Sequence, residues 1–253
     1  MRALILAGVA AASLALSSPL MAAGDVPHPR SVNWSFNGLF GTYDRGALQR
    51  GFQVYTEVCA SCHSLELLSY RNLRAIGFSE DRVKEIAAEV EVTDGPNDEG
   101  EMFDRPGRPS DRFASPFPNS QAARASNGGA FPPDLSLMTK ARKDGINYLN
   151  ALLVGFADPP ADKEIAEGMN YNPYFPGGQI AMAPPLSEDV VEYADKTKAT
   201  VAQMASDVTT FLAWAAEPEL EERKRMGIKV VLFLIVLTGL LYAIKRRVWA
   251  DVH

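Results

Sequence analysis

The stretch VYTEVCASCHSLELL, residues 54–68, holds both cysteines of the 253-residue chain and one of its three histidines. Cys59, Cys62 and His63 fall within five consecutive positions. The segment that leads into them places apolar side chains at the spacing of one helix face, at Leu48, Phe52, Tyr55 and Cys59. We therefore expect the motif at the C-terminal end of an amphipathic helix.

Three interpretations of the two cysteines compete. A disulfide between Cys59 and Cys62 would suit an oxidising compartment, and a redox-active pair would need a thioredoxin-like βαβ context that the sequence lacks. The third is covalent haem attachment, for which C-x-x-C-H is the characteristic pattern. The two thiols add to the vinyl groups on one edge of the macrocycle, and the next residue reaches under its plane to bind iron. We interpret Cys59 and Cys62 as the attachments of one haem c, and His63 as its proximal ligand.

The sixth position of such an iron is either open to small ligands or filled, and a methionine there makes an electron carrier with a raised potential. Met182 lies in GGQIAMAPPLS, residues 177–187, between a glycine pair and a proline pair. This stiff, irregular loop can present a thioether to a ring face, so Met182 is the predicted ligand. Less favoured candidates are Met102, Met138, Met169, Met204, His28 and His253.

Both ends of the chain carry targeting information. Residues 1–23 begin with one early arginine and continue as an apolar run that ends in small residues, which predicts a cleaved bacterial signal peptide; an uncleaved anchor is the alternative. Residues 226–244 contain a single charge, Lys229, and just span a hydrocarbon core of about 30 Å. A buried core helix is the alternative for this second segment.

Three basic residues follow the apolar segment directly, at 245–247, which favours a cytoplasmic C-terminus. The predicted organisation is a periplasmic haem domain over residues 24–225, a transmembrane anchor over 226–244 and a cytoplasmic tail over 245–253. We therefore expect a single-pass protein of a bacterial inner membrane.

The exported part reads as helices separated by long loops rich in proline and glycine. Further helices are expected over 79–91, 145–156 and from 201 onward, with Thr200 and Gln203 as the predicted capping box of the last of these helices. The formal net charge of −6 argues against a nucleic-acid partner.

Several segments, in order, resemble the cytochrome c1 family, the haem subunits of the quinol–cytochrome c oxidoreductase (cytochrome bc1) complex. The similar segments are LQRGFQVYTEVCASCHS (48–64), AEVEVTDGPNDEGEMFDRPGRPSDRF (88–113), AARASNGGAFPPDLS (122–136), NPYFPGGQIAMAPPL (172–186) and FLAWAAEPELEERKRMG (211–227). The resemblance covers nearly the whole mature chain. It implies an all-α, c-type cytochrome-like domain with long loop insertions and one C-terminal transmembrane helix.

The resemblance also implies further residues around the haem. Arg142 and Tyr148 would contact a propionate; the alternative for Arg142 is an exposed charge at a helix entry. Asn127 and Pro133 resemble the loop that lines the ring, where a backbone carbonyl should accept the His63 Nδ1–H.

Some bacterial relatives carry an additional cysteine pair. This chain has only Cys59 and Cys62, so its loop over residues 161–168 must be held in another way.

The implied function is electron relay: one electron arrives from a Rieske iron–sulfur subunit and leaves to a cytochrome c. The chain needs no catalytic base or nucleophile of its own, and its anchor would pack against cytochrome b in a dimeric complex. The acidic stretch Glu85–Glu101 is either a solvated face or a docking surface for a basic cytochrome c. The alternatives are a free-standing anchored cytochrome c and a haem sensor or enzyme with an open sixth site.

Overall fold

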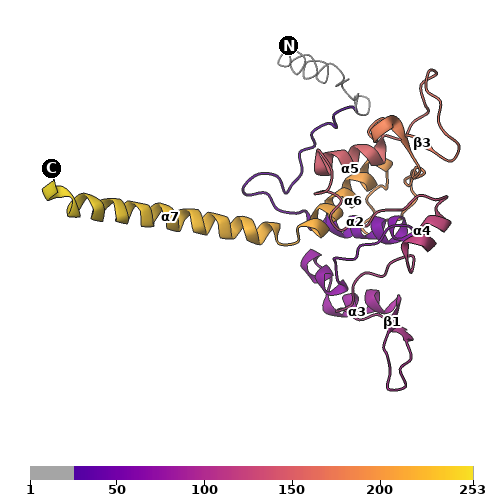
Figure 1. Ribbon diagram of the computed structural model, residues 1–253, viewed down its shortest axis with the longest axis horizontal. Coiled ribbons are helices and arrows are strands. Elements are labelled where there is room, and N and C mark those ends of the chain that lie inside the picture. Colours follow the sequence, from indigo (N-terminus) through magenta and orange to yellow (C-terminus); the bar gives the residue numbers. More distant parts are fainter. Residues whose placement is uncertain (1–25, 253) are drawn as a thin grey trace, which may run out of the picture.

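The computed structural model describes residues 26–252 and shows a helical domain from which one long helix projects (Figure 1). The predicted signal peptide and His253 lie outside the described residues. The α-helices are α2 (Arg45–Glu57), α3 (Glu80–Ala88), α4 (Ser120–Ser126), α5 (Gly145–Val154), α6 (Val201–Ala216) and α7 (Leu220–Val248). Short 3-10 helices cover Cys59–Ser61, Tyr70–Ile76, Pro176–Gly178 and Ala250–Val252.

Two small antiparallel ribbons interrupt the long loops. One pairs β1 (Glu91–Asp94) with β2 (Phe103–Pro106), and the other pairs β3 (Asn170–Tyr171) with β4 (Gln179–Ile180). The predicted helical fold with long loops is confirmed, and the two ribbons were not predicted from the sequence. The first ribbon ends the helix predicted over 79–91 early, because Glu91 already belongs to β1.

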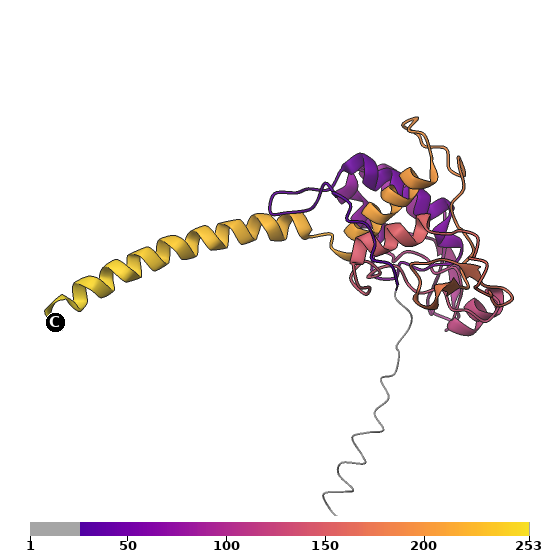
Figure 2. The same ribbon diagram turned by 90° about the horizontal axis from the view of Figure 1, so that it is seen from above.

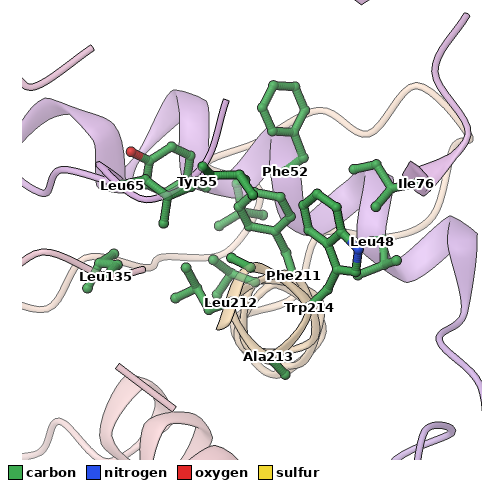
Figure 3. Close-up of a cluster of buried hydrophobic side chains, with 14 of the residues drawn as sticks. Leu48, Phe52, Tyr55, Leu65, Ile76, Leu135, Phe211, Leu212, Ala213 and Trp214 are labelled. Carbon is green, nitrogen blue, oxygen red and sulfur yellow. The ribbon is translucent and has the colours of Figure 1, made fainter. Parts of the chain in front are cut away.

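Helices α2 and α6 cross at the centre of the core (Figure 3). They meet at Gly51, where a Cβ atom would lie 2.1 Å from the backbone oxygen of Asp207, so only glycine permits this approach. Phe52 and Tyr55 of α2 bring their ring centroids within 5.7 and 5.8 Å of Phe211 on α6. The crossing therefore fixes the end of α2 that leads into the cysteine motif.

A buried ion pair also joins the two helices. Arg50 donates from Nε and Nη2 to the Asp207 carboxylate at 2.9 and 3.1 Å, and only 1% of the Asp207 side chain is exposed. Thr200 caps α6 by accepting from the backbone amide of Gln203. The reciprocal half of the expected capping box is wrong, because the Gln203 amide donates to Asp207 instead.

Helix α7 is long and apolar enough to cross a membrane, and none of its most apolar stretch is buried against the rest of the described chain. It begins at Leu220, six residues before the apolar segment expected from the sequence. Figure 2 shows α7 extending away from the helical domain, so its apolar surface is available to lipid or to other subunits.

Candidate functional site

The cysteine motif forms one tight turn at the end of α2. The backbone amides of Cys62 and His63 both donate to the Cys59 carbonyl, at 3.1 and 2.9 Å. No bond joins the two half-buried sulfurs. Burial raises the pKa of the Cys59 thiol to about 12, whereas a reactive cysteine needs a lowered pKa. The turn thus presents two thiols and an imidazole from one short segment.

The His63 imidazole is oriented by the loop that contains the sequence FPPDLS, residues 131–136. Its Nδ1 lies 2.8 Å from the carbonyl oxygen of Pro133, and a carbonyl can only accept, so the proton is on Nδ1. Burial lowers the pKa of His63, and the bond to Pro133 opposes this shift. The carbonyl contact expected from the sequence is therefore present, and Nε2 is left with its lone pair, as a metal ligand requires.

Asp134 fastens this loop to the segment that follows the motif. Its carboxylate accepts hydrogen bonds from the Ser64 hydroxyl at 2.9 Å and from the amides of Glu66 and Ser136 at 2.8 Å each. Burial would raise the pKa of Asp134, but these hydrogen bonds outweigh it and hold the pKa below its usual value. Because Asp134 follows Pro133, it sets the position of the carbonyl that orients His63.

Met182 lies half-buried in the irregular loop that follows β4. The loop is tied to α5 by Asn172, which is fully buried: its side-chain amide donates to the Leu152 carbonyl at 2.8 Å. The backbone amide of Asn172 donates to Gly178 at 3.1 Å and so closes the turn before Met182. Both contacts hold the methionine segment in place without a helix around it.

The side chain of Gln179 holds the loop over residues 161–168, which has no second cysteine pair to fasten it. Its side-chain oxygen accepts from the Ala166 amide at 2.9 Å, and its nitrogen donates to the Glu164 carbonyl at 3.3 Å. Gln179 is three residues from Met182, so the same side chain fixes that loop and the approach to the methionine.

The other candidates for the sixth ligand are placed less favourably. Met138 and Met204 are buried in the hydrophobic core, and Met102 is 60% exposed on the turn between β1 and β2. The His28 side chain is 78% exposed and lies 3.7 Å from the Asp144 carboxylate. Among the methionines within residues 26–252, only Met182 and Met169 are half-buried.

The remaining predicted residues lie on α4, α5 and the loops before them. Arg142 is exposed, donates only to the neighbouring Ala141 carbonyl, and forms no salt bridge within residues 26–252. Tyr148 is half-buried on α5, close enough for Arg142 to influence its pKa, which burial raises. Asn127 ends α4 and donates to the Ala123 carbonyl at 2.7 Å. Of the residues predicted to surround the haem, only Pro133 forms a hydrogen bond with His63 in the described part of the chain.

Sequence reasoning missed Asp134 and Asn172, which position the loops that carry the predicted ligands. The only signal available was a polar residue beside the FPPDLS and NPYFPGG segments, where turn formation is an equally good explanation. The donor set itself fits a covalently attached haem c: two thiols for the vinyl groups, one imidazole with a free Nε2 and one loop thioether.

Comparisons with known proteins agree with this chemistry. The Cytochrome C1 family matches residues 34–252. A cytochrome c1 haem protein of Arabidopsis thaliana is 53% identical and covers 97% of this chain and 81% of the relative. The cytochrome c1 of Rhodospirillum rubrum is 49% identical, with 99% and 97% covered. The catalytic subunit of the Candida albicans cytochrome b-c1 complex is 50% identical, with 89% and 78% covered. With its family match spanning the whole helical domain and α7, the chain belongs to the cytochrome c1 family.

Proposed function

We propose that this chain is the membrane-anchored haem subunit of a quinol–cytochrome c oxidoreductase, and that it relays single electrons from a Rieske iron–sulfur subunit to a cytochrome c. The chain is an electron-transfer protein with covalently bound haem c, as its family membership and its haem-protein relatives establish. A subunit of a cytochrome b-c1 complex is among those relatives, so it works within a membrane complex. The observation that carries the proposal is the cysteine turn with its oriented histidine.

In this proposal each residue of the turn has its own role in binding the haem. Cys59 and Cys62 would hold the haem through thioethers, and His63 would hold the iron through Nε2. The hydrogen bond from Nδ1 to Pro133 fixes the tautomer and keeps the imidazole electron-rich, which stabilises the oxidised iron. The bound haem supplies one iron that changes charge by a single electron.

The other predicted residues set the potential of the iron and the access to it. Met182 would hold the iron through its thioether sulfur, which would raise the potential and exclude small ligands. Arg142 pairs with a propionate, since its guanidinium has no carboxylate partner within residues 26–252, and Tyr148 adds a hydroxyl from the same region. Asn127 and Pro133 line the ring.

The acidic stretch provides the docking surface for a cytochrome c with a basic face. Some acids of the stretch already have basic partners within the chain. Arg82 lies within ion-pair distance of Glu85 and Glu89, and Arg105 pairs with Asp94. Four exposed acids on or beside the hairpin formed by β1 and β2 have no such partner in the described part of the chain: Glu91, Asp98, Glu99 and Glu101. We assign the long-range attraction to these four, with an effect on association that falls as salt rises.

We assign the orientation of the chain in the membrane from helix α7 and its basic end. Helix α7 serves as the single membrane anchor, and its basic end at Lys245–Arg247 stays in the cytoplasm. The haem domain then lies in the periplasm, and the anchor packs against cytochrome b in a dimeric complex.

The test is single-turnover electron transfer in the purified membrane complex. A quinol should reduce the haem of this chain, and a basic cytochrome c should then reoxidise it at a rate that decreases with ionic strength. Glu99→Lys should slow the second step and flatten its salt dependence, whereas Glu222→Lys, the same change of charge on α7, should leave it unaltered. A haem that quinol does not reduce would contradict the relay, and equal effects of both variants would remove the hairpin from the docking surface.

A further inference from the structure

A short loop, residues 36–41, projects from the helical domain beside the first turns of α7 (Figures 1 and 2). Its tip carries two large apolar side chains in open solvent: Leu39 is 59% exposed and Phe40 is 80% exposed. Phe40 is more exposed than Phe233, at 64%, in the apolar part of α7. None of the haem-site residues uses this loop, so its exposed tip needs a separate explanation.

The loop is built into the fold at its base. Phe36 is buried, and its ring centroid lies 4.7 Å from that of Tyr43 and 5.9 Å from that of Trp34. A Cβ atom on Gly41 would lie 2.0 Å from the backbone oxygen of Asn37, so the turn closes only with glycine. The protein thus holds Leu39 and Phe40 outward on a rigid base.

A lysine of α7 ties the loop to the helix. Lys224 Nζ donates to the carbonyl oxygens of Phe36 and Gly41, at 2.6 and 3.0 Å, one on either side of the tip. The last charge before the apolar run of α7 is Lys229, five residues further on. At about 1.5 Å per residue this is roughly 7.5 Å along the axis, which the tip of the loop can span.

The tip therefore lies at the level where the charges of α7 give way to apolar side chains. A bilayer crossed by α7 has its headgroup region at this level, and long basic side chains near a helix end, such as Arg225 and Lys229, can reach that region. Apolar side chains that enter such an interface lie a few ångströms into the boundary with the acyl chains.

We propose that Leu39 and Phe40 insert into the lipid interface on the side of the haem domain, as a second membrane contact beside α7. One helix alone leaves the domain free to tilt and rotate about its anchor. A second contact, joined to α7 through Lys224, fixes the orientation of the haem relative to the membrane. The inference rests on the membrane-anchoring part of the proposed function. Lipid is the favoured occupant because the exposed tip continues the exposed apolar surface of α7.

The test places a nitroxide spin label at single introduced cysteines of the full-length, haem-loaded chain within its complex. The complex is reconstituted into phosphatidylcholine–phosphatidylglycerol vesicles. The haem thioethers leave no native thiol of this chain to label, and the same complex without an introduced cysteine gives the background signal of the other subunits. The label is compared at Phe40→Cys, at Phe103→Cys on the distant hairpin and at Val236→Cys in the middle of α7. Collision rates are measured with oxygen, which concentrates in lipid, and with a water-soluble nickel chelate.

The proposal predicts that oxygen collides with the label at position 40 several-fold more often than the chelate does, with the opposite order at position 103. A label at 40 that behaves like the one at 103 places the tip in water and overturns the inference. Protection from both reagents at 40 places the tip against another subunit, such as cytochrome b, and overturns it equally. If position 236 is also in water, the anchor itself fails, which distinguishes that outcome from failure of the loop alone.

Discussion

Asp134→Ala tests the proposed role of the loop that orients His63. The substitution removes the acceptor for three hydrogen bonds, from the Ser64 hydroxyl and from the amides of Glu66 and Ser136. A hydrogen bond to a charged acceptor contributes about 1.5–3 kcal/mol. Because Asp134 is partly exposed, water replaces some of this, so the expected loss is about 2–4 kcal/mol. For a domain of this size that corresponds to a fall in Tm of about 4–16 °C.

The variant should also change the haem. Without Asp134 the Pro133 carbonyl is no longer held, the hydrogen bond from His63 Nδ1 weakens, and the reduction potential should rise. Thermal unfolding and a redox titration of the haem-loaded protein measure both effects. The matched control is Asp98→Ala, an exposed acid with no hydrogen bond or ion pair from its side chain within residues 26–252. Equal Tm and potential for the two variants would refute the reasoning.

The remaining predictions concern acid stability, the crossing of α2 and α6 at Gly51, and the hydrogen bonds of Gln179 next to the methionine segment. The pKa of Asp134 is lower in the folded state than in the unfolded chain, so its contribution is complete above about pH 4 and disappears as the pH falls through the folded pKa; Asp134→Asn should flatten acid unfolding there. Gly51→Ala should cost about 2–4 kcal/mol, because the new methyl group would lie 2.1 Å from a backbone oxygen of α6, whereas Gly46→Ala in the same helix should be neutral or slightly stabilising in chemical denaturation. Gln179→Ala should loosen the segment before the methionine and raise the fraction of reduced haem that binds carbon monoxide, and Gln121→Ala should not.

The parts of the molecule that local chemistry dictates could be predicted from the sequence. The spacing of Cys59, Cys62 and His63 is imposed by the cofactor, and the apolar face of α6 by its contact with α2, so both are visible in short windows. The long apolar segment of α7 is recognised by composition alone. The start of α7 at Leu220 was less visible, because its first two turns carry charged residues.

The contacts that position the ligands could not be predicted in the same way. Asp134 bonds residues 68 to 70 positions away, and Asn172 bonds a carbonyl 20 positions away. Aspartate and asparagine next to proline and glycine favour turns in any protein, so their local pattern gives no sign of such partners. The hydrogen bond of Gln203 was equally hard to predict. Its side chain donates to the buried Asp207 of the same helix instead of forming its half of the expected capping box.

In the proposed site His63 and Met182 hold the iron of one haem c. The most direct measurement of this ligation is the absorption spectrum of the full-length protein and of Met182→Leu, oxidised and reduced, with and without carbon monoxide. The half-buried Met169→Leu serves as the matched control. We expect the weak sulfur-to-iron band in the oxidised parent and in Met169→Leu, and we expect Met182→Leu to lose the band and to bind carbon monoxide. Carbon monoxide binding by the parent, or an unchanged band in Met182→Leu, would contradict this ligation.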